Sequence, residues 1–179
     1  MPKIIEGAKE SILHCTRKHL SETGYTSLSL RLIAKECHLG VGTIYNYFSS
    51  KDDLVAQIML EDWLKCLAEM DRHIDTAIDA ETGLIQIQQI LKKYCTQYES
   101  LFKEAESSAH VVSSRHDLLV HQMKERIQKL LNQFNQDDDY SVLLAEIMLI
   151  NATKNTINDQ HFKKAIHQLL RKEHHYEQL

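Results

Sequence analysis

The sequence predicts an all-α protein, and three observations support this fold class. First, the 179-residue chain has five glycines and one proline, Pro2, so the turn signals of a sandwich, a barrel or a doubly wound sheet are missing. Second, apolar residues recur at steps of three and four, which is the period of an amphipathic helix. Third, 43% of the residues are hydrophobic and 26% are charged, a balance that excludes a disordered chain or a fibre.

The length and the cysteines narrow the class of protein further. A chain of this size can bury a core in one or two small helical domains. No apolar run reaches the roughly 18 residues of a membrane span, and the acidic start of the chain lacks the apolar region of a signal peptide. The four cysteines lie far apart, without a C-x-x-C pair. We therefore expect reduced thiols in a cytoplasmic protein without a membrane segment.

Three helices are predicted in the first 50 residues. The first covers about residues 3–23 and ends at Gly24, a residue suited to a helix C-cap. A second, short helix runs from its N-cap Ser29 to residue 36, and a third covers residues 41–48. The four residues between these two helices form a tight turn. The side chains expected to build a small core beneath them are Ile33, Ile44, Phe48 and Leu54.

A longer helical region follows. Ser50 is placed to cap a helix that keeps a 3.6-residue apolar stripe as far as Ile74. Further helices are predicted over about residues 82–106 and 116–134. Residues 142–152 are apolar nearly all round, and the last helix carries the apolar stripe Phe162, Ile166, Leu169 and Leu170. The predicted architecture is an N-terminal three-helix head followed by a larger helical domain.

The paired short helices of the head indicate a helix-turn-helix unit. Such a unit lays its second helix in the DNA major groove, while other positions hold phosphates. Short paired helices also occur in plain bundles, so the pattern alone leaves both interpretations open.

The residues of this segment resemble the DNA-binding head of the TetR family (TetR/AcrR-like) of bacterial transcriptional regulators. The resemblance covers about residues 5–60 and rests on a G-T-I-Y-N-Y-F-x-x-K core, and it includes Gly24-Tyr25, residues 29–34 and residues 50–54. The rest of the chain matches the family in helix number and order. The resemblance implies a DNA-binding domain at residues 1–50, with its helix-turn-helix at about 29–48, and an effector-binding and dimerisation domain at residues 51–179.

Five residues around the third helix have the chemistry of a DNA contact. Thr43 offers a hydroxyl and a methyl group where base edges or a phosphate lie. The phenols of Tyr45 and Tyr47 can reach phosphate oxygens, and Lys51 adds a cation at the start of the next helix. Gly42 has no side chain, so its backbone can approach the DNA closely. A tyrosine at helical spacing also suits plain half-buried packing, and the resemblance favours the DNA contact.

Four more contacts follow from positions in the family. Ser29 and Arg31, at the start of the second helix, meet the DNA backbone or a base edge. Asn46 can read an adenine edge. Val41 stands where the family commonly has a polar or basic reader, and it can contact a thymine methyl group or replace a hydrogen-bonding contact.

The turn departs from the family at two positions. The residue that is usually glycine is His38 here, so a positive φ is expected at a side chain that tolerates it with strain. Gly40 stands where serine or threonine often caps the recognition helix, a change that costs only a few tenths of a kcal/mol.

For the larger domain, the resemblance implies an effector cavity and a dimer interface. Residues 142–152 must be covered on all sides, which fits a homodimer formed through the last two helices; a monomeric core helix is the alternative. Aromatic, soft or polar side chains on otherwise apolar faces suit a small-molecule cavity. They are equally compatible with an ordinary core. These candidates are Trp63, Tyr94, Tyr98, Phe102, Met123 and Asn151.

No metal site, cofactor or catalytic centre is expected. Cys15 and His19 form an i, i+4 pair, but both belong to the apolar stripe of the first helix. Phosphate-loop, zinc-protease and nucleophile-elbow motifs are missing. The acidic run at residues 137–139 is interpreted as a solvated helix cap. The protein is therefore expected to be no enzyme.

The charge distribution agrees with a DNA-binding head. The whole chain has a net charge of −4, which taken alone argues against nucleic acid. Residues 1–51, however, hold seven lysines and arginines against four acidic residues, a net +3, and the remainder is −7. The sequence thus predicts a dimeric TetR-like repressor on a pseudo-palindromic operator in double-stranded DNA, released by an unknown small molecule. The alternatives are an activator or co-regulator without an inducer, and an all-helical metal- or protein-binding module.

Overall fold

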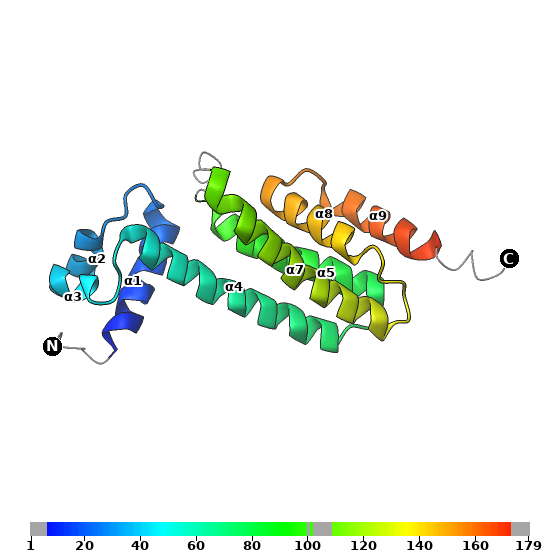
Figure 1. Ribbon diagram of the computed structural model, residues 1–179, viewed down its shortest axis with the longest axis horizontal. Helices are drawn as coiled ribbons and strands as arrows, with labels where there is room; N and C mark the ends of the chain where they lie inside the picture. The colour runs from blue at the N-terminus through cyan, green and yellow to red at the C-terminus, as the bar shows by residue number, and fades with distance from the viewer. Residues whose placement is uncertain (1–6, 100, 102–108, 173–179) are drawn as a thin grey trace. The chain divides into compact units, whose positions relative to one another are not determined.

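The computed structural model confirms the all-α class (Figure 1). It describes residues 7–99, 101 and 109–172, and over these residues it contains eight helices and no strand. The chain divides into two compact units, Met1–Leu64 and Lys65–Leu179. The predicted domain boundary after residue 50 falls at the start of helix α4 (Lys51–Asp75), whose first part belongs to the first unit.

The first unit is the predicted three-helix head with the beginning of α4 packed on it. Its helices are α1 (Ala8–Thr23), α2 (Leu30–Glu36) and α3 (Val41–Tyr45). The expected core is confirmed, because the side chains of Ile33, Ile44, Phe48 and Leu54 are all buried. Ile12 from α1 and Ile58 from α4 complete this core, and both are fully enclosed.

The helix ends of the head follow the capping signals in the sequence. Gly24 ends α1 with φ 80°, and its N–H donates to the Leu20 carbonyl at 3.2 Å. The Ser29 hydroxyl caps α2 by accepting from the Leu32 N–H at 3.2 Å. The Ser50 hydroxyl accepts from the Asp53 N–H at 3.0 Å and caps α4. Three predicted caps are thus confirmed.

Several helix boundaries differ from the prediction, and among them the helix predicted over about residues 82–106 ends at Gln97. Helix α3 ends at Tyr45 rather than residue 48. Beyond it the regular hydrogen-bond pattern is broken, because the Tyr47 N–H bonds the Ile44 carbonyl three residues back and the Phe48 N–H shares that same carbonyl. Helix α5 starts at Ala80, earlier than expected, where the Asp79 carboxylate caps it by accepting from the Thr82 N–H at 2.7 Å. Helix α7 also starts earlier than expected, at Ala109.

The second unit contains the end of α4 with α5 (Ala80–Gln97), α7 (Ala109–Gln133), α8 (Ser141–Lys154) and α9 (Asp159–Lys172). Helices α5, α7 and α8 pack against one another, and α9 packs on α5 (Figure 1). Ion pairs join neighbouring helices at the rim of this core. Those with atoms within 2.9 Å are Arg126–Asp71, Lys129–Asp75 and Lys92–Asp159. Hydrogen-bonding contacts of similar length join His116 to Glu146 and His167 to Glu81.

Helix α8 is only half covered within this chain. Its buried side includes Leu144, Ala145 and Met148. The opposite side exposes a second set of apolar side chains, of which Leu143 is 56% exposed. The exposed apolar face of α8 consists of Val142, Leu143, Ile147 and Ile150. No helix that the structure describes is long and apolar enough to cross a membrane.

The packing of α5 against α7 depends on a glycine. A Cβ atom at Gly83 would lie 2.6 Å from Cδ1 of Leu130 on α7, and Leu130 is fully buried. We expect Gly83→Ala to lower the free energy of unfolding by about 1–3 kcal/mol, because overpacking outweighs the better helix propensity of alanine. Chemical denaturation monitored by circular dichroism measures the change. Gln89→Ala on the exposed side of α5 is the control, and equal stabilities of the two variants would contradict the prediction.

Candidate nucleic-acid interface

The turn between α2 and α3 has the geometry of a helix-turn-helix. Cys37 ends α2, and the Leu39 N–H reaches back to the Ala34 carbonyl at 2.8 Å. His38 has φ 55°, so the expected left-handed residue at the usual glycine position is present. Gly40 is the N-cap of α3, and no side chain bonds the first N–H groups of that helix. Backbone conformation, rather than a capping hydroxyl, therefore sets the entry to α3.

The nine predicted contact residues are all solvent-accessible. Tyr45 is 57% exposed and Val41 is 36% exposed, whereas Ile44 between them is buried. A Cβ added at Gly42 would meet no atom within 4 Å, so the backbone there lies open to a ligand. The other residues of the predicted contact face, all exposed or half-buried, are Ser29, Arg31, Thr43, Asn46, Tyr47 and Lys51.

Lys51 is held in place by Tyr25, which sequence reasoning treated only as part of a motif. The Lys51 ammonium lies 3.8 Å from the centroid of the Tyr25 ring and donates to the Tyr25 carbonyl at 3.3 Å. The Tyr25 hydroxyl donates in turn to the Asp52 carboxylate. The loop before α2 is thereby tied to the start of α4. The G-Y dipeptide and the S-K-D run were the signals that could have paired these residues.

Arg17 does not add to the positive face of the head. Its guanidinium donates to Glu61 at 2.6 Å and forms a second ion pair with Asp62 at 3.1 Å. Burial lowers the pKa of Arg17, but the hydrogen bonds and charges of Glu61 and Asp62 outweigh it and raise the pKa above its ordinary value. This arginine therefore joins α1 to α4 and is compensated locally.

His19 joins three segments of the head, a role that its place in the apolar stripe did not indicate. The ring is buried, and its Nε2 lies 2.8 Å from the Thr23 hydroxyl and 3.1 Å from the Ser27 hydroxyl. Its Nδ1 lies 3.3 Å from Glu36 at the end of α2. The ring therefore connects α1, the following loop and α2 through hydrogen-bonding contacts.

The predicted effector residues do not form one described cavity. Tyr94 and Tyr98 lie together, with ring centroids 5.2 Å apart. Met123 and Asn151 are fully buried. The side-chain amide oxygen of Asn151 accepts from the Ile157 N–H at 2.8 Å, and its side-chain amide nitrogen has no partner. Trp63 is buried in the first unit. Phe102 lies outside the described residues.

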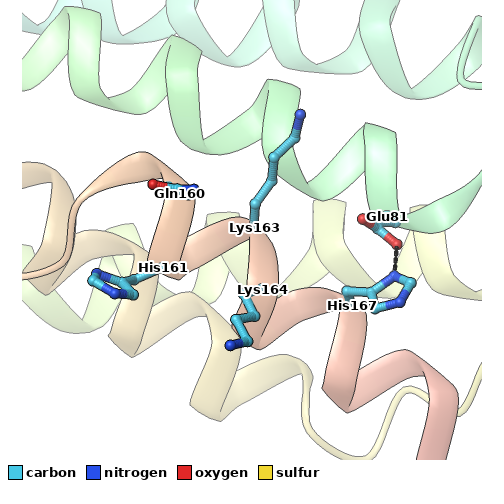
Figure 2. A pocket seen from close by; sticks show the side chains of 6 residues that line it. All are labelled: Glu81, Gln160, His161, Lys163, Lys164 and His167. Atoms are coloured by element: carbon cyan, nitrogen blue, oxygen red, sulfur yellow. Dashed lines mark hydrogen bonds and ion pairs between the residues drawn. The ribbon is translucent and has the colours of Figure 1, made fainter.

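An open hollow of about 510 Å³ lies beside α9, away from these candidates. Figure 2 shows six polar side chains around it, with Lys163 directed toward α5 and Lys164 directed away. His167 Nδ1 lies 2.7 Å from a carboxylate oxygen of Glu81 at one edge, within hydrogen-bond distance. None of the predicted effector residues lines this hollow, and its walls belong to exposed faces of α5 and α9.

The acidic run lies between α7 and α8. The three carboxylates of Asp137, Asp138 and Asp139 lie within 4.8 Å of one another, and they are the one such group of possible metal ligands in the described part of the chain. The Asp138 carbonyl accepts from the Ser141 N–H at 2.9 Å. This contact places the run just before α8. The N-cap of α8 is Tyr140, and no side chain caps that helix, so the predicted helix-cap role is not found.

This geometry defines a class: an N-terminal helix-turn-helix domain, of the kind that binds DNA, attached to a separate helical unit. Residues 12–58 match the family model described as bacterial regulatory proteins, tetR family. The first unit is thus similar to the DNA-binding head of the TetR family of bacterial transcriptional regulators.

Several relatives are similar to this chain. The HTH-type transcriptional regulator UidR of Escherichia coli strain K12 is 38% identical over 64 residues, which are 36% of this chain and 33% of the relative. The match thus spans about a third of the length of that regulator. An uncharacterized HTH-type transcriptional regulator of Haemophilus influenzae is 26% identical over 141 residues, covering 72% of this chain and 73% of the relative.

Solved structures extend the similarity in fold to nearly the whole chain. Salmonella enterica GusR has a TM-score of 0.65 and 18% identity, and the match covers 94% of this chain and 99% of that one. A transcriptional regulator from Cytophaga hutchinsonii has a TM-score of 0.69 and 17% identity, with coverages of 93% and 98%. At these identities the likeness shows that the fold is shared.

The contacts of His19 lead to a prediction about the head. His19→Ala removes a buried ring together with its contacts to Thr23, Ser27 and Glu36, so we expect it to destabilise the first unit by about 1–3 kcal/mol. Hydrogen exchange of the α1 and α2 amides measures this loss. His14→Ala, at an exposed position of the same helix, is the matched control. Equal exchange rates in the two variants would show that the network does not stabilise the head.

Proposed function

We propose that this protein is a homodimeric transcriptional repressor that binds a pseudo-palindromic operator in double-stranded DNA and is released by a small-molecule effector. It acts in the cytoplasm, where bacterial DNA is found. The observation that carries the proposal is the contact face around α3. Its exposed hydroxyl, amide and cationic side chains lie around a buried Ile44–Phe48 anchor.

Each residue of the contact face has a role in this proposal. Lys51 and Tyr47 bind phosphates, which position the head on the duplex. Thr43 and Asn46 approach base edges in the major groove, where each base pair has its own donor and acceptor pattern. Val41 contributes an apolar contact, suited to a thymine methyl group. Ser29, Arg31 and Tyr45 extend the contact along the backbone, and Gly42 permits the close approach.

The dimer is proposed to form through α8 and α9, with a second copy of this chain as the occupant of the exposed apolar face of α8. Leu143, Ile147 and Ile150 follow one another at spacings of four and three residues, so they form a continuous stripe. A stripe of this kind is what a two-fold helix bundle buries. Dimerisation also places two heads in successive major grooves, about 34 Å apart.

The effector is proposed to act in the second unit, where Tyr94, Tyr98, Met123 and Asn151 belong. The Asn151 amide nitrogen, buried without a partner, supports a polar contact to such a ligand. Release follows if the effector binds more tightly to an arrangement of the dimer whose head spacing does not fit the operator.

DNA selection tests the central proposal. From random duplexes the protein should select a pseudo-palindrome whose half-sites lie about one helical turn apart. Lys51→Ala should weaken binding to all sequences alike and lower the slope of log K against log[salt] by about one, because one phosphate contact is lost. Tyr47→Phe should also weaken binding uniformly.

Lys9→Ala, on the exposed surface of α1, is the matched cation control and should leave the slope unchanged. Selection of no site at low salt would refute the regulator. A change of preference at a single base pair in Lys51→Ala would show that this lysine reads bases instead.

The oligomeric state tests the proposed interface. Leu143→Glu puts a charge into the middle of the exposed apolar face of α8, so we expect the dimer dissociation constant to rise at least a hundredfold. Sedimentation equilibrium measures it. Gln89→Glu, on the exposed side of α5, is the charge-matched control and should remain dimeric. A dimer unaffected by Leu143→Glu would place the interface elsewhere.

A further inference from the structure

Two cysteines that are far apart in the sequence meet in the first unit. Cys15 lies on α1, and Cys37 is the C-cap of α2. The Cys37 thiol donates to the Ser11 carbonyl at 3.6 Å. Because Ser11 lies one helical turn before Cys15, this contact brings Cys37 to the same turn of α1. The Cys15 side chain is close enough to contribute to the raised pKa of Cys37.

Both thiols are free and only half-buried, so a small reagent in solvent can reach them. We propose that Cys15 and Cys37 form a reversible intramolecular disulfide when the protein meets a hydroperoxide, and that this disulfide weakens DNA binding. The second part of the proposal rests on the proposed function. The first part concerns the chemistry of the head alone.

The two sulfurs have different roles in this reaction. The pKa of Cys37 is raised to about 12. Burial is the largest cause, and the neighbouring Cys15 side chain raises the pKa further. Cys37 therefore keeps its proton at neutral pH and is assigned as the resolving sulfur, which leaves Cys15 as the sulfur that meets the peroxide first. Toward a peroxide, the thiolate rather than the thiol is the nucleophile.

The reaction balances in two steps. The Cys15 thiolate attacks one peroxide oxygen, the O–O bond breaks, and an alcohol or water leaves after taking up a proton, which produces a sulfenic acid at Cys15. The Cys37 sulfur then attacks the Cys15 sulfur. The S–O bond breaks, and the departing hydroxide takes the Cys37 proton and leaves as water. The two cysteines lose two electrons in total, and the peroxide gains them.

The remaining cysteines provide an internal comparison. Cys66 and Cys95 are both buried in the second unit. Burial is the main cause that raises the pKa of each thiol to about 12. A buried thiol of high pKa reacts slowly with a peroxide, so oxidation should occur first in the head.

The position of Cys37 connects the disulfide to DNA binding. Cys37 immediately precedes His38, whose left-handed backbone makes the turn, and Gly40 then begins α3. A disulfide bond is about 2.05 Å long, which is shorter than any contact between two unbonded thiols. Bond formation therefore pulls the end of α2 toward α1 and displaces the turn that positions α3.

Mass spectrometry of the full chain tests disulfide formation. After treatment with hydrogen peroxide the reduced protein should lose about 2 Da, peptide mapping should find Cys15 linked to Cys37, and dithiothreitol should reverse both changes. Cys15→Ser and Cys37→Ser should each abolish the loss, whereas the matched control Cys95→Ala should keep it. A link through Cys66 or Cys95, or oxidation without any intramolecular link, would overturn the proposal.

DNA affinity tests the consequence. On the duplex selected by the reduced protein, the oxidised protein should bind at least tenfold more weakly and recover with dithiothreitol, and Cys37→Ser should be insensitive to peroxide. Unchanged affinity of the disulfide form would refute the regulatory role. If the reduced protein selects no duplex, the proposed function fails, and the mass measurement still decides whether the disulfide forms.

Discussion

The burial of Ile44 and Phe48 is the interaction on which the candidate interface depends. Helix α3 has five residues, far fewer than an isolated helix needs to persist in water. Its position must therefore come from tertiary packing, and these two side chains supply it by entering the core that Ile33 and Leu54 complete. Every exposed side chain of α3 is oriented by that anchor. The same burial explains why the chain can follow a strained φ at His38: the core on both sides holds the turn.

The helix ends of the head were predictable because they depend on residues that are close to one another in the sequence. Ser29 and Ser50 cap the N-termini of α2 and α4, and Gly24 ends α1. Each bonds a residue no more than four positions away, so the sequence alone locates these caps. The contacts of His19 and Tyr25 were missed because they join residues on different helices. A histidine in an apolar stripe looks the same whether it fills a core or connects three segments.

The second unit was less predictable than the head, and α8 shows the reason. Its sequence is apolar nearly all round. This pattern indicates that the helix must be covered, but it does not indicate which surface covers it. The structure separates a side buried by this chain from a side that this chain leaves open, where Leu143 and Ile147 lie. The predicted effector residue Asn151 was equally hard to interpret from the sequence. Its side-chain amide oxygen accepts a hydrogen bond from the loop after α8, whereas its side-chain amide nitrogen has no partner. The spacing of apolar residues in the sequence cannot distinguish a buried face from an open one, or a bonded polar atom from an unpartnered one.

The net charge of the head overstates what is offered to DNA, and the geometry of two cations shows how. Arg17 is neutralised by Glu61 and Asp62, so its charge serves the packing of α1 on α4. Lys51 is held over the Tyr25 ring and uses one N–H on the Tyr25 carbonyl, which leaves other donors of its ammonium for a phosphate. A lysine side chain has about 2 kcal/mol of rotamer entropy. Because Tyr25 already restricts that freedom, a phosphate contact made by Lys51 costs less ordering than one made by an unrestrained lysine.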